Sequence, residues 1–129
     1  PHPGEAARLL DTSVSDIQKD RLASISKLTE SYSANVLLKG KYSLVQGLDN
    51  DIPLMITTGN PGMATAGMGD LLTGVTCSFL GQFGTEDSAK IVSIAAHVHS
   101  KSGDLASRKG ERGMIASDLL THIRELVNP

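Results

Sequence analysis

Aromatic residues are scarce in this sequence: tryptophan is absent, and only 3% of the 129 residues are aromatic. The core must therefore be built from Leu, Ile, Val, Ala and Met, which favours helices packed on a sheet over an aromatic-rich β-sandwich. The content of hydrophobic residues, 40%, and of charged residues, 20%, is typical of globular proteins. We therefore expect one domain with a substantial core.

Cysteine, excess charge and long apolar runs are also lacking. The single cysteine, Cys77, excludes an internal disulfide and a zinc-type cluster, and a reducing cytoplasm is its simplest setting. A net charge of −2 favours neither nucleic acid nor an anionic membrane as a partner. No apolar run approaches the ~20 residues that span a bilayer, and no signal peptide is recognisable. We expect a cytoplasmic protein with no membrane contact.

A glycine-rich loop organises what is present. Residues 54–57 are typical of a strand and residues 71–80 of a buried helix, and the loop between them contains Gly59, Gly62, Gly67 and Gly69 and ends on Asp70. The unpaired amides and partial positive charge at the start of such a helix suit a phosphate. A carboxylate beside a phosphate indicates proton abstraction or metal contact. The alternative is a tight turn in which Asp70 stabilises a first helical turn by roughly 0.3–1 kcal/mol.

The remaining periodicity predicts an α/β architecture. The apolar run at 35–39 is typical of a buried parallel strand, and a hairpin of residues 42–46 and 54–57 is expected at the edge of its sheet. Helices are predicted at residues 4–10, from a cap at Thr12 or Ser13 to about Ser31, from a cap at Thr85 to about Ala106, and from about Ser117 to Val127.

Residues 60–70, Asn-Pro-Gly-Met-Ala-Thr-Ala-Gly-Met-Gly-Asp, resemble the signature of the ADP/ATP-dependent NAD(P)H-hydrate dehydratases, members of the ribokinase-like superfamily. Further matches, in the family's order, lie at residues 1–5, 36–40 and 110–119. The resemblance implies a three-layer α/β/α fold with a mostly parallel sheet flanked by helices. Since family members are about twice this length, we interpret residues 1–129 as the C-terminal half of one such domain.

The resemblance also implies site residues. Lys39, at the carboxyl end of a predicted strand where ligands gather in open α/β sheets, would bind an adenine nucleotide with its neighbours Gly40, Lys41, Tyr42 and Ser43. The amides of Ala66, Gly67, Met68 and Gly69 would hold its phosphates, Asp70 would be the general base, and His2 and Asp70 would contact the substrate. From residue types alone, a lysine leaving a strand is merely solvated, His2 has no assigned role, and Glu5 is a first-turn acid.

The implied activity is repair of hydrated NADH or NADPH. ADP or ATP, with Mg²⁺, would phosphorylate the ring hydroxyl, and loss of phosphate would restore the double bond, as in a carbon–oxygen lyase. The resemblance implies two kinds of partner: the N-terminal half of the same enzyme, and further copies of the enzyme in a homo-oligomer, which we expect to be a tetramer. Two alternatives stay open: a vitamin-precursor or other small-molecule kinase of the same superfamily, and a nucleotide-binding half that is inactive on its own.

Two histidines and the cysteine remain. His97 and His99 are two apart on a predicted helix, which separates their directions by about 200° and prevents them from sharing a metal. We expect one to be packed and the other exposed. Cys77 is predicted to be a small core residue. No residue is assigned as a metal ligand, and no Gly-x-Ser-x-Gly motif indicates a hydrolase.

Overall fold

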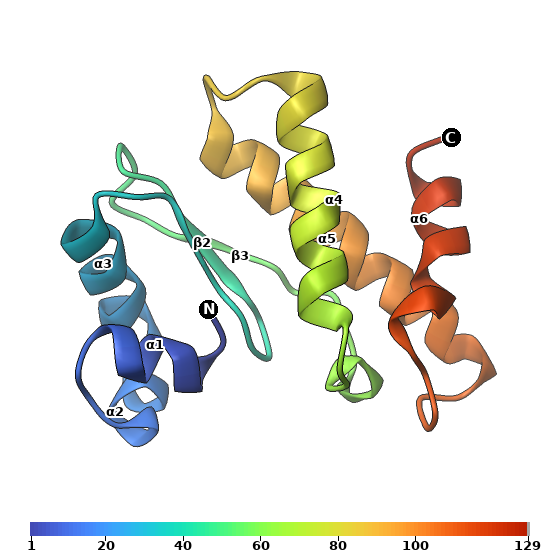
Figure 1. Ribbon diagram of the computed structural model, residues 1–129, viewed down its shortest axis with the longest axis horizontal. Coiled ribbons are helices and arrows are strands. Elements are labelled where there is room, and N and C mark those ends of the chain that lie inside the picture. Colours follow the sequence, from blue (N-terminus) through green and yellow to red (C-terminus); the bar gives the residue numbers. More distant parts are fainter. Residues whose placement is uncertain (129) are drawn as a thin grey trace. The chain divides into compact units, whose positions relative to one another are not determined.

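Three short helices open the first of two units, Pro1–Ile56, in the computed structural model, which describes residues 1–128. They are α1 (Pro3–Leu9), α2 (Val14–Lys19) and α3 (Arg21–Tyr32) (Figure 1). α1 confirms the predicted helix at 4–10, but the single helix predicted up to Ser31 is wrong. Asp20 ends α2 with a non-helical backbone, and its side chain caps α3 by accepting from the Ala23 amide at 2.9 Å. One aspartate therefore divides the pattern into two helices.

The sheet of this unit contains β1 (Val36–Leu38), β2 (Leu44–Gln46) and β3 (Leu54–Met55), in that order. The antiparallel pairing of β2 with β3 confirms the predicted hairpin. β1 also pairs antiparallel with β2, so within residues 1–128 the prediction of a mostly parallel sheet is wrong. Only residues 39–43 join β1 to β2, whereas a parallel pair requires a crossover of about a dozen residues or more.

The core of the first unit lies between its helices and this sheet. α3 contacts β1 and β2, and α1 contacts both α2 and α3. The buried cluster is aliphatic, as the composition predicts, and contains Ala6, Ala7, Ile17, Ile25, Leu28, Val36, Leu38 and Leu44. This packing fixes the start of α1 and the end of β1, which carry candidate site residues.

The second unit, Thr57–Pro129, is helical in its described part. It contains α4 (Met68–Phe83), α5 (Ser88–Ala106), α6 (Leu119–Leu126) and the 3-10 turns η1 (Pro61–Met63), η2 (Ser107–Lys109) and η3 (Ala116–Asp118). α5 contacts both α4 and α6 (Figure 1). The predicted cap at Thr85 is wrong, since Asp87 caps α5. The last helix begins at Leu119, after the 3-10 turn that contains Ser117.

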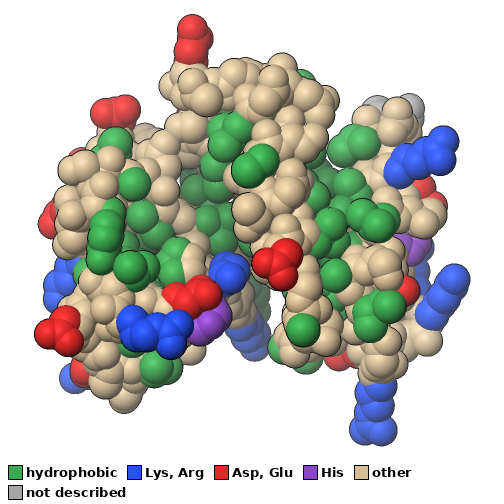
Figure 2. All heavy atoms as spheres, in the orientation of Figure 1, with side chains coloured by type: hydrophobic (Ala, Val, Ile, Leu, Met, Phe, Trp, Pro, Cys, Tyr) green, Lys and Arg blue, Asp and Glu red, His purple; other side chains and the backbone are tan. Residues whose placement is uncertain are grey.

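Cys77 is exposed on α4, so its prediction as a core residue is wrong. The buried residues of α4 are Met68 and Val75, seven apart and on one face, and Cys77 points about 200° away from Val75. Hydrophobic side chains also reach the surface seen in Figure 2, which is normal and defines no interface by itself. Within residues 1–128, no helix combines the length and apolar character required to cross a bilayer.

Candidate active site

The glycine-rich loop folds tightly before α4. Asn60 precedes η1, and its side-chain oxygen accepts from the Gly62 amide at 3.1 Å. A β-carbon at Gly62 would lie 2.7 Å from the carbonyl oxygen of Glu111, so no side chain fits there. Gly67 adopts a φ of +83° immediately before the helix, a conformation that favours glycine. Gly62 and Gly67 are therefore required by the path of the loop.

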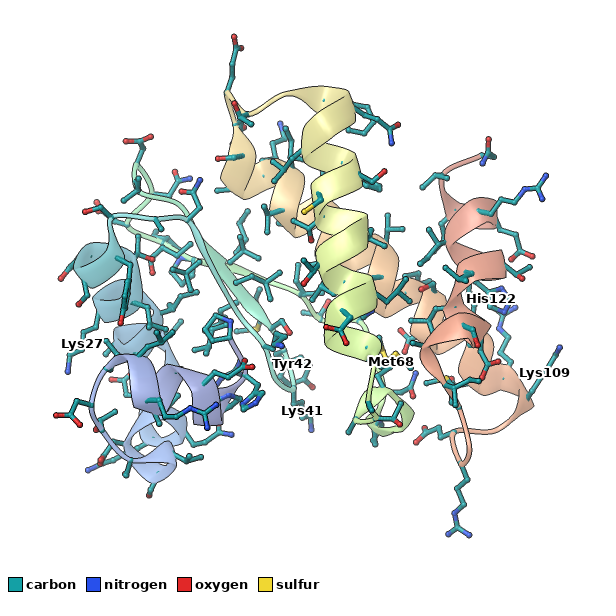
Figure 3. The ribbon with its side chains drawn as sticks, in the orientation of Figure 1. Lys27, Lys41, Tyr42, Met68, Lys109 and His122 are labelled. Atoms are coloured by element: carbon teal, nitrogen blue, oxygen red, sulfur yellow. The ribbon has the colours of Figure 1, made fainter. Side chains whose placement is uncertain are left out.

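The first turn of α4 carries free amides. Its first helical hydrogen bond runs from the Leu71 amide to the Gly67 carbonyl at 2.9 Å. The amides of Met68, Gly69 and Asp70 precede this bond, and the helix has no side-chain cap, whereas α1, α2, α3 and α5 are all capped by a side chain. These donors, with the partial positive charge of a 16-residue helix, can bind an anion. Figure 3 shows Met68 where the loop joins α4.

Asp70 stands beside these amides and is exposed. The neighbouring hydroxyl of Thr73 donates to the Gly69 carbonyl at 3.0 Å, so it does not engage this carboxylate. An exposed carboxylate in the first turn can accept a proton from a group held at the same helix end. In the part of the chain that the structure describes, no three His, Cys, Asp or Glu residues form a group that could hold a metal ion.

In the first unit, the structure brings His2, Glu5 and Lys39 together. The His2 ring caps α1, because its Nδ1 accepts from the amides of Gly4 at 3.0 Å and Glu5 at 3.2 Å. The Glu5 carboxylate accepts in return from the His2 amide at 2.6 Å, and this bond is the main reason why the pKa of Glu5 is lowered. Lys39 Nζ lies 3.7 Å from Glu5 Oε2. His2 therefore has a structural role that its residue type did not indicate.

The other predicted nucleotide-binding residues of this unit form the turn between β1 and β2. The Ser43 hydroxyl donates to the Gly40 carbonyl at 3.1 Å and accepts from the Gly40 amide at 3.3 Å. Lys41 Nζ lies 5.3 Å from the centre of the Tyr42 ring, and both side chains lie at the tip of the turn (Figure 3). The turn thus presents an ammonium group and a ring at one tip.

Arg21 holds this turn, and sequence reasoning missed it. Its guanidinium donates to the carbonyls of Lys41 at 2.5 Å, Tyr42 at 3.1 Å and Leu38 at 3.3 Å. The five donors of a guanidinium suit such multiple contacts. Arg21 lies in an apolar stripe of the predicted helix, whose residues recur every three to four positions. An arginine within such a stripe is the signal that could have indicated a partner. The apolar members of the stripe include Val14, Ile17, Ile25 and Leu28.

Comparison with known proteins decides the family. A family model described as NAD(P)H-hydrate dehydratase matches residues 1–125. The bifunctional NAD(P)H-hydrate repair enzyme of Vibrio cholerae is 45% identical over 130 residues, which cover 99% of this chain and 25% of that enzyme. The chain belongs to the NAD(P)H-hydrate dehydratase family. The resemblance carried by the sequence motifs is confirmed.

Solved structures of similar proteins agree with this membership of the NAD(P)H-hydrate dehydratase family. The ADP/ATP-dependent NAD(P)H-hydrate dehydratase of Bacillus subtilis, co-crystallized with ATP/Mg²⁺, matches with a TM-score of 0.90 and 26% identity over 98% of this chain and 45% of that one. A ribokinase-like superfamily protein of Enterococcus faecalis matches with a TM-score of 0.76 and 28% identity over 100% of this chain and 44% of that one. The chain thus spans less than half of these structures and 25% of the Vibrio enzyme.

His99 of this dehydratase-family chain packs against the site from α5. Its side chain is 5% exposed while His97 is exposed, which confirms the prediction of one packed and one exposed histidine. Burial lowers the pKa of His99, and a hydrogen bond with the Met68 backbone partly opposes that effect. His99 Nε2 has no partner among the described residues. A buried neutral imidazole therefore lies beside the first residue of α4.

This lowered pKa predicts acid sensitivity. The unfolded chain takes up a proton on His99 near pH 6.5, but the folded protein does so only at lower pH. Stability linked to His99 is therefore complete above about pH 6.5 and is lost as pH falls through the folded pKa. We expect the free energy of urea unfolding to decrease less between pH 7 and 5 in His99→Gln than in the wild type. His97→Gln, the exposed control, should keep the wild-type slope, and equal slopes in all three proteins would contradict this assignment.

Proposed function

We propose that the enzyme containing this chain is an ADP- or ATP-dependent NAD(P)H-hydrate dehydratase, a carbon–oxygen lyase that repairs hydrated NADH and NADPH. The observation that carries the proposal is the first turn of α4, where free amides adjoin the exposed Asp70 carboxylate. Membership of the NAD(P)H-hydrate dehydratase family supplies the substrate class. Anion-binding donors beside a base are what transfer of a phosphoryl group to a hydroxyl requires.

The reaction divides a difficult dehydration into two steps. The ring hydroxyl attacks the terminal phosphorus of the nucleotide and forms an O–P bond, while the bridging P–O bond breaks and the nucleotide leaves with one phosphate fewer; Asp70 takes the hydroxyl proton. The bond between the ring carbon and the phosphate oxygen then breaks, phosphate leaves with the electron pair, and loss of a proton from the adjacent ring carbon restores the double bond. Water leaves poorly in this position and phosphate leaves well. The chain's own part is to hold the phosphoryl oxygens and to accept the first proton.

The predicted site residues take roles in this reaction. The amides of Ala66, Gly67, Met68 and Gly69 hold the transferred phosphoryl group, and Asp70 faces the hydroxyl. In the first unit, the nucleotide contacts are Lys39, Gly40, Lys41, Tyr42 and Ser43. Lys39 is the main one, since an ammonium group at a strand end suits phosphates. His2 lines the pocket for the hydrate, with Nδ1 engaged in the helix cap.

Mg²⁺ fits this proposal as a companion of the nucleotide. Residues 1–128 contain no group of three metal-binding side chains, and Mg²⁺ in phosphoryl-transfer sites is held by substrate phosphates and one or two carboxylates. The related Bacillus subtilis enzyme was co-crystallized with ATP/Mg²⁺. The ion would neutralise charge on the phosphates, and no residue of this chain is assigned as its ligand.

The proposed activity belongs to the longer enzyme. Relatives of known structure are about twice as long as the chain, so we propose that an N-terminal half completes the three-layer α/β/α ribokinase-like domain and its substrate pocket. We further propose a homo-oligomer, a tetramer, in the cytoplasm. Family membership supports the proposal of an N-terminal half. The single cysteine supports the reducing compartment.

A product assay tests the function. The complete enzyme, supplied with hydrated NADH, Mg²⁺ and either ADP or ATP, should restore the absorbance of reduced nicotinamide and release phosphate in equal amounts. Accumulation of a stable phosphoester would instead identify a small-molecule kinase of the same fold. Binding of nucleotide without any turnover would reduce the role of the protein to nucleotide binding. Either of these two outcomes overturns the proposal.

A further inference from the structure

Asp104 of α5 holds the glycine-rich loop through two hydrogen bonds. Its Oδ2 accepts from the Gly59 amide at 3.0 Å, and its Oδ1 accepts from Asn60 Nδ2 at 3.2 Å. Both distances fall within the range of N–H···O hydrogen bonds, and a carboxylate acceptor makes such bonds stronger than neutral ones. Asp104 is 44 residues from Asn60 in sequence. The carboxylate therefore joins α5 to the loop.

Asn60 links Asp104 to the backbone of the glycine-rich loop. Its Oδ1 accepts from the Gly62 amide at 3.1 Å while its Nδ2 faces Asp104. The orientation of the amide is thereby fixed, because a flipped Asn60 would point a donor at the Gly62 amide and an acceptor at Asp104. One side chain thus couples the α5 carboxylate to the backbone at η1.

A second contact seats the same loop on α5. A β-carbon at Gly103 would overlap Met63 Sδ, so the methionine occupies the space that a larger residue at 103 would fill. Met63 also packs against the buried cluster that contains Met68, the first residue of α4. Two neighbouring positions of α5 therefore fix the loop that leads to the anion-binding amides.

We propose that Asp104 is a positioning residue for the dehydratase reaction: through Gly59 and Asn60 it sets the path of the loop that brings the amides of Ala66 to Gly69 to the phosphoryl group. This inference rests on the proposed function. Asp104 acts through the loop rather than on the substrate, because both its oxygens are engaged by Gly59 and Asn60. Its role is to keep the donors in place before the nucleotide arrives.

Exchanging the carboxylate and the amide between positions 104 and 60 tests this role. Asp104→Asn directs a donor at the Nδ2 of Asn60, and Asn60→Asp directs a carboxylate at the carboxylate of Asp104. The double variant Asn60→Asp/Asp104→Asn restores every pairing. The new amide at position 104 would donate to the new carboxylate at position 60 and accept from the Gly59 amide, while that carboxylate also accepts from the Gly62 amide. A coupling of this kind is measured by a double-mutant cycle.

In the complete enzyme, we expect each single variant to lower kcat/KM for hydrated NADH by about 10- to 100-fold. The double variant should recover to within about threefold of the wild type. Amide hydrogen exchange at Gly59 and Gly62 should be faster in the single variants and slow again in the double variant. The circular dichroism spectrum and Tm show that each protein is folded, so that rates refer to folded enzyme.

Two failures are distinguishable. If the wild type does not convert hydrated NADH, the proposed function fails, and the positioning role is then judged by the affinity for ADP alone, which should fall in the single variants and return in the double variant. If the wild type is active but the double variant is no better than the worse single variant, the positioning role is overturned. Retained slow exchange at both glycines in an inactive single variant would overturn it as well.

Discussion

We expect Asp70→Asn to lower the turnover of hydrated NADH by the complete enzyme by about 10²–10⁴-fold, the range that a general base contributes. Asparagine keeps the size and shape of the side chain but does not accept the hydroxyl proton at neutral pH. Asp70 is exposed, so its replacement removes no packing, and surface substitutions of this kind change stability by only about 0.5 kcal/mol. The expected result is a folded protein with the same Tm and very little turnover.

Nucleotide affinity separates this loss from damage to the phosphate site. A carboxylate beside a bound anion repels it, so Asp70→Asn should bind ADP or ATP as tightly as the wild type or more tightly, while kcat falls. Glu86→Gln is the matched control, since Glu86 is an exposed acid of the same unit and should keep wild-type kcat and KM. Normal turnover by Asp70→Asn in the complete enzyme would refute the role of Asp70 as base.

The helices could be predicted from the sequence where one physical signal dominates. The apolar sequence places α4 and α5 within a few residues of their observed bounds: α4 runs from Met68 to Phe83 where residues 71–80 are predicted, and Asp87 caps α5 where Thr85 is predicted. The break between α2 and α3 at Asp20 was not predicted, because the apolar stripe of the helix continues on both sides of this residue. An aspartate is compatible with the solvated face of a helix as well as with a helix cap. Only the hydrogen bond from the Ala23 amide to the Asp20 side chain identifies this residue as a cap.

Strand direction could not be predicted from the apolar run at 35–39. A strand that is buried on both faces is continuously hydrophobic whether its neighbour is parallel or antiparallel, so the apolar run alone does not give the direction of pairing. The decisive feature was the length of the connection to β2, residues 39–43, which is short enough only for an antiparallel return. A prediction that the strand at 36–38 also forms a hairpin with the strand at 44–46 gives the correct topology.

The candidate site also contains residues that the sequence identifies and residues that it does not. The loop, its glycines and Asp70 could be identified because they are contiguous and follow a long motif. Arg21 and Asp104 could not, because their partners are backbone groups or a distant asparagine, and any residue type supplies a carbonyl or an amide. Long-range contacts to the backbone therefore leave no pattern in a single sequence, although they fix the geometry of both candidate binding segments.

Leu119→Ala should destabilise the second unit by about 2–5 kcal/mol, as large-to-small changes in a packed core do. Leu119 is 0% exposed and belongs to the cluster formed with Met68, Ala106 and Met114. Truncation leaves a cavity in the cluster that contains Met68, the first residue of α4. We expect a lower midpoint of urea unfolding, followed by circular dichroism at fixed pH.

Leu120→Ala is the matched control, because Leu120 is the next residue of α6 and is 54% exposed. It should change the free energy of unfolding by only about 0.5 kcal/mol. Equal losses in both variants would show that the cluster around Leu119 is not the core of this unit. Since Met68 both belongs to that cluster and begins α4, a cavity there should also weaken ADP or ATP binding in folded Leu119→Ala. The packing of α6 would then be what holds the anion-binding end of α4 rigid.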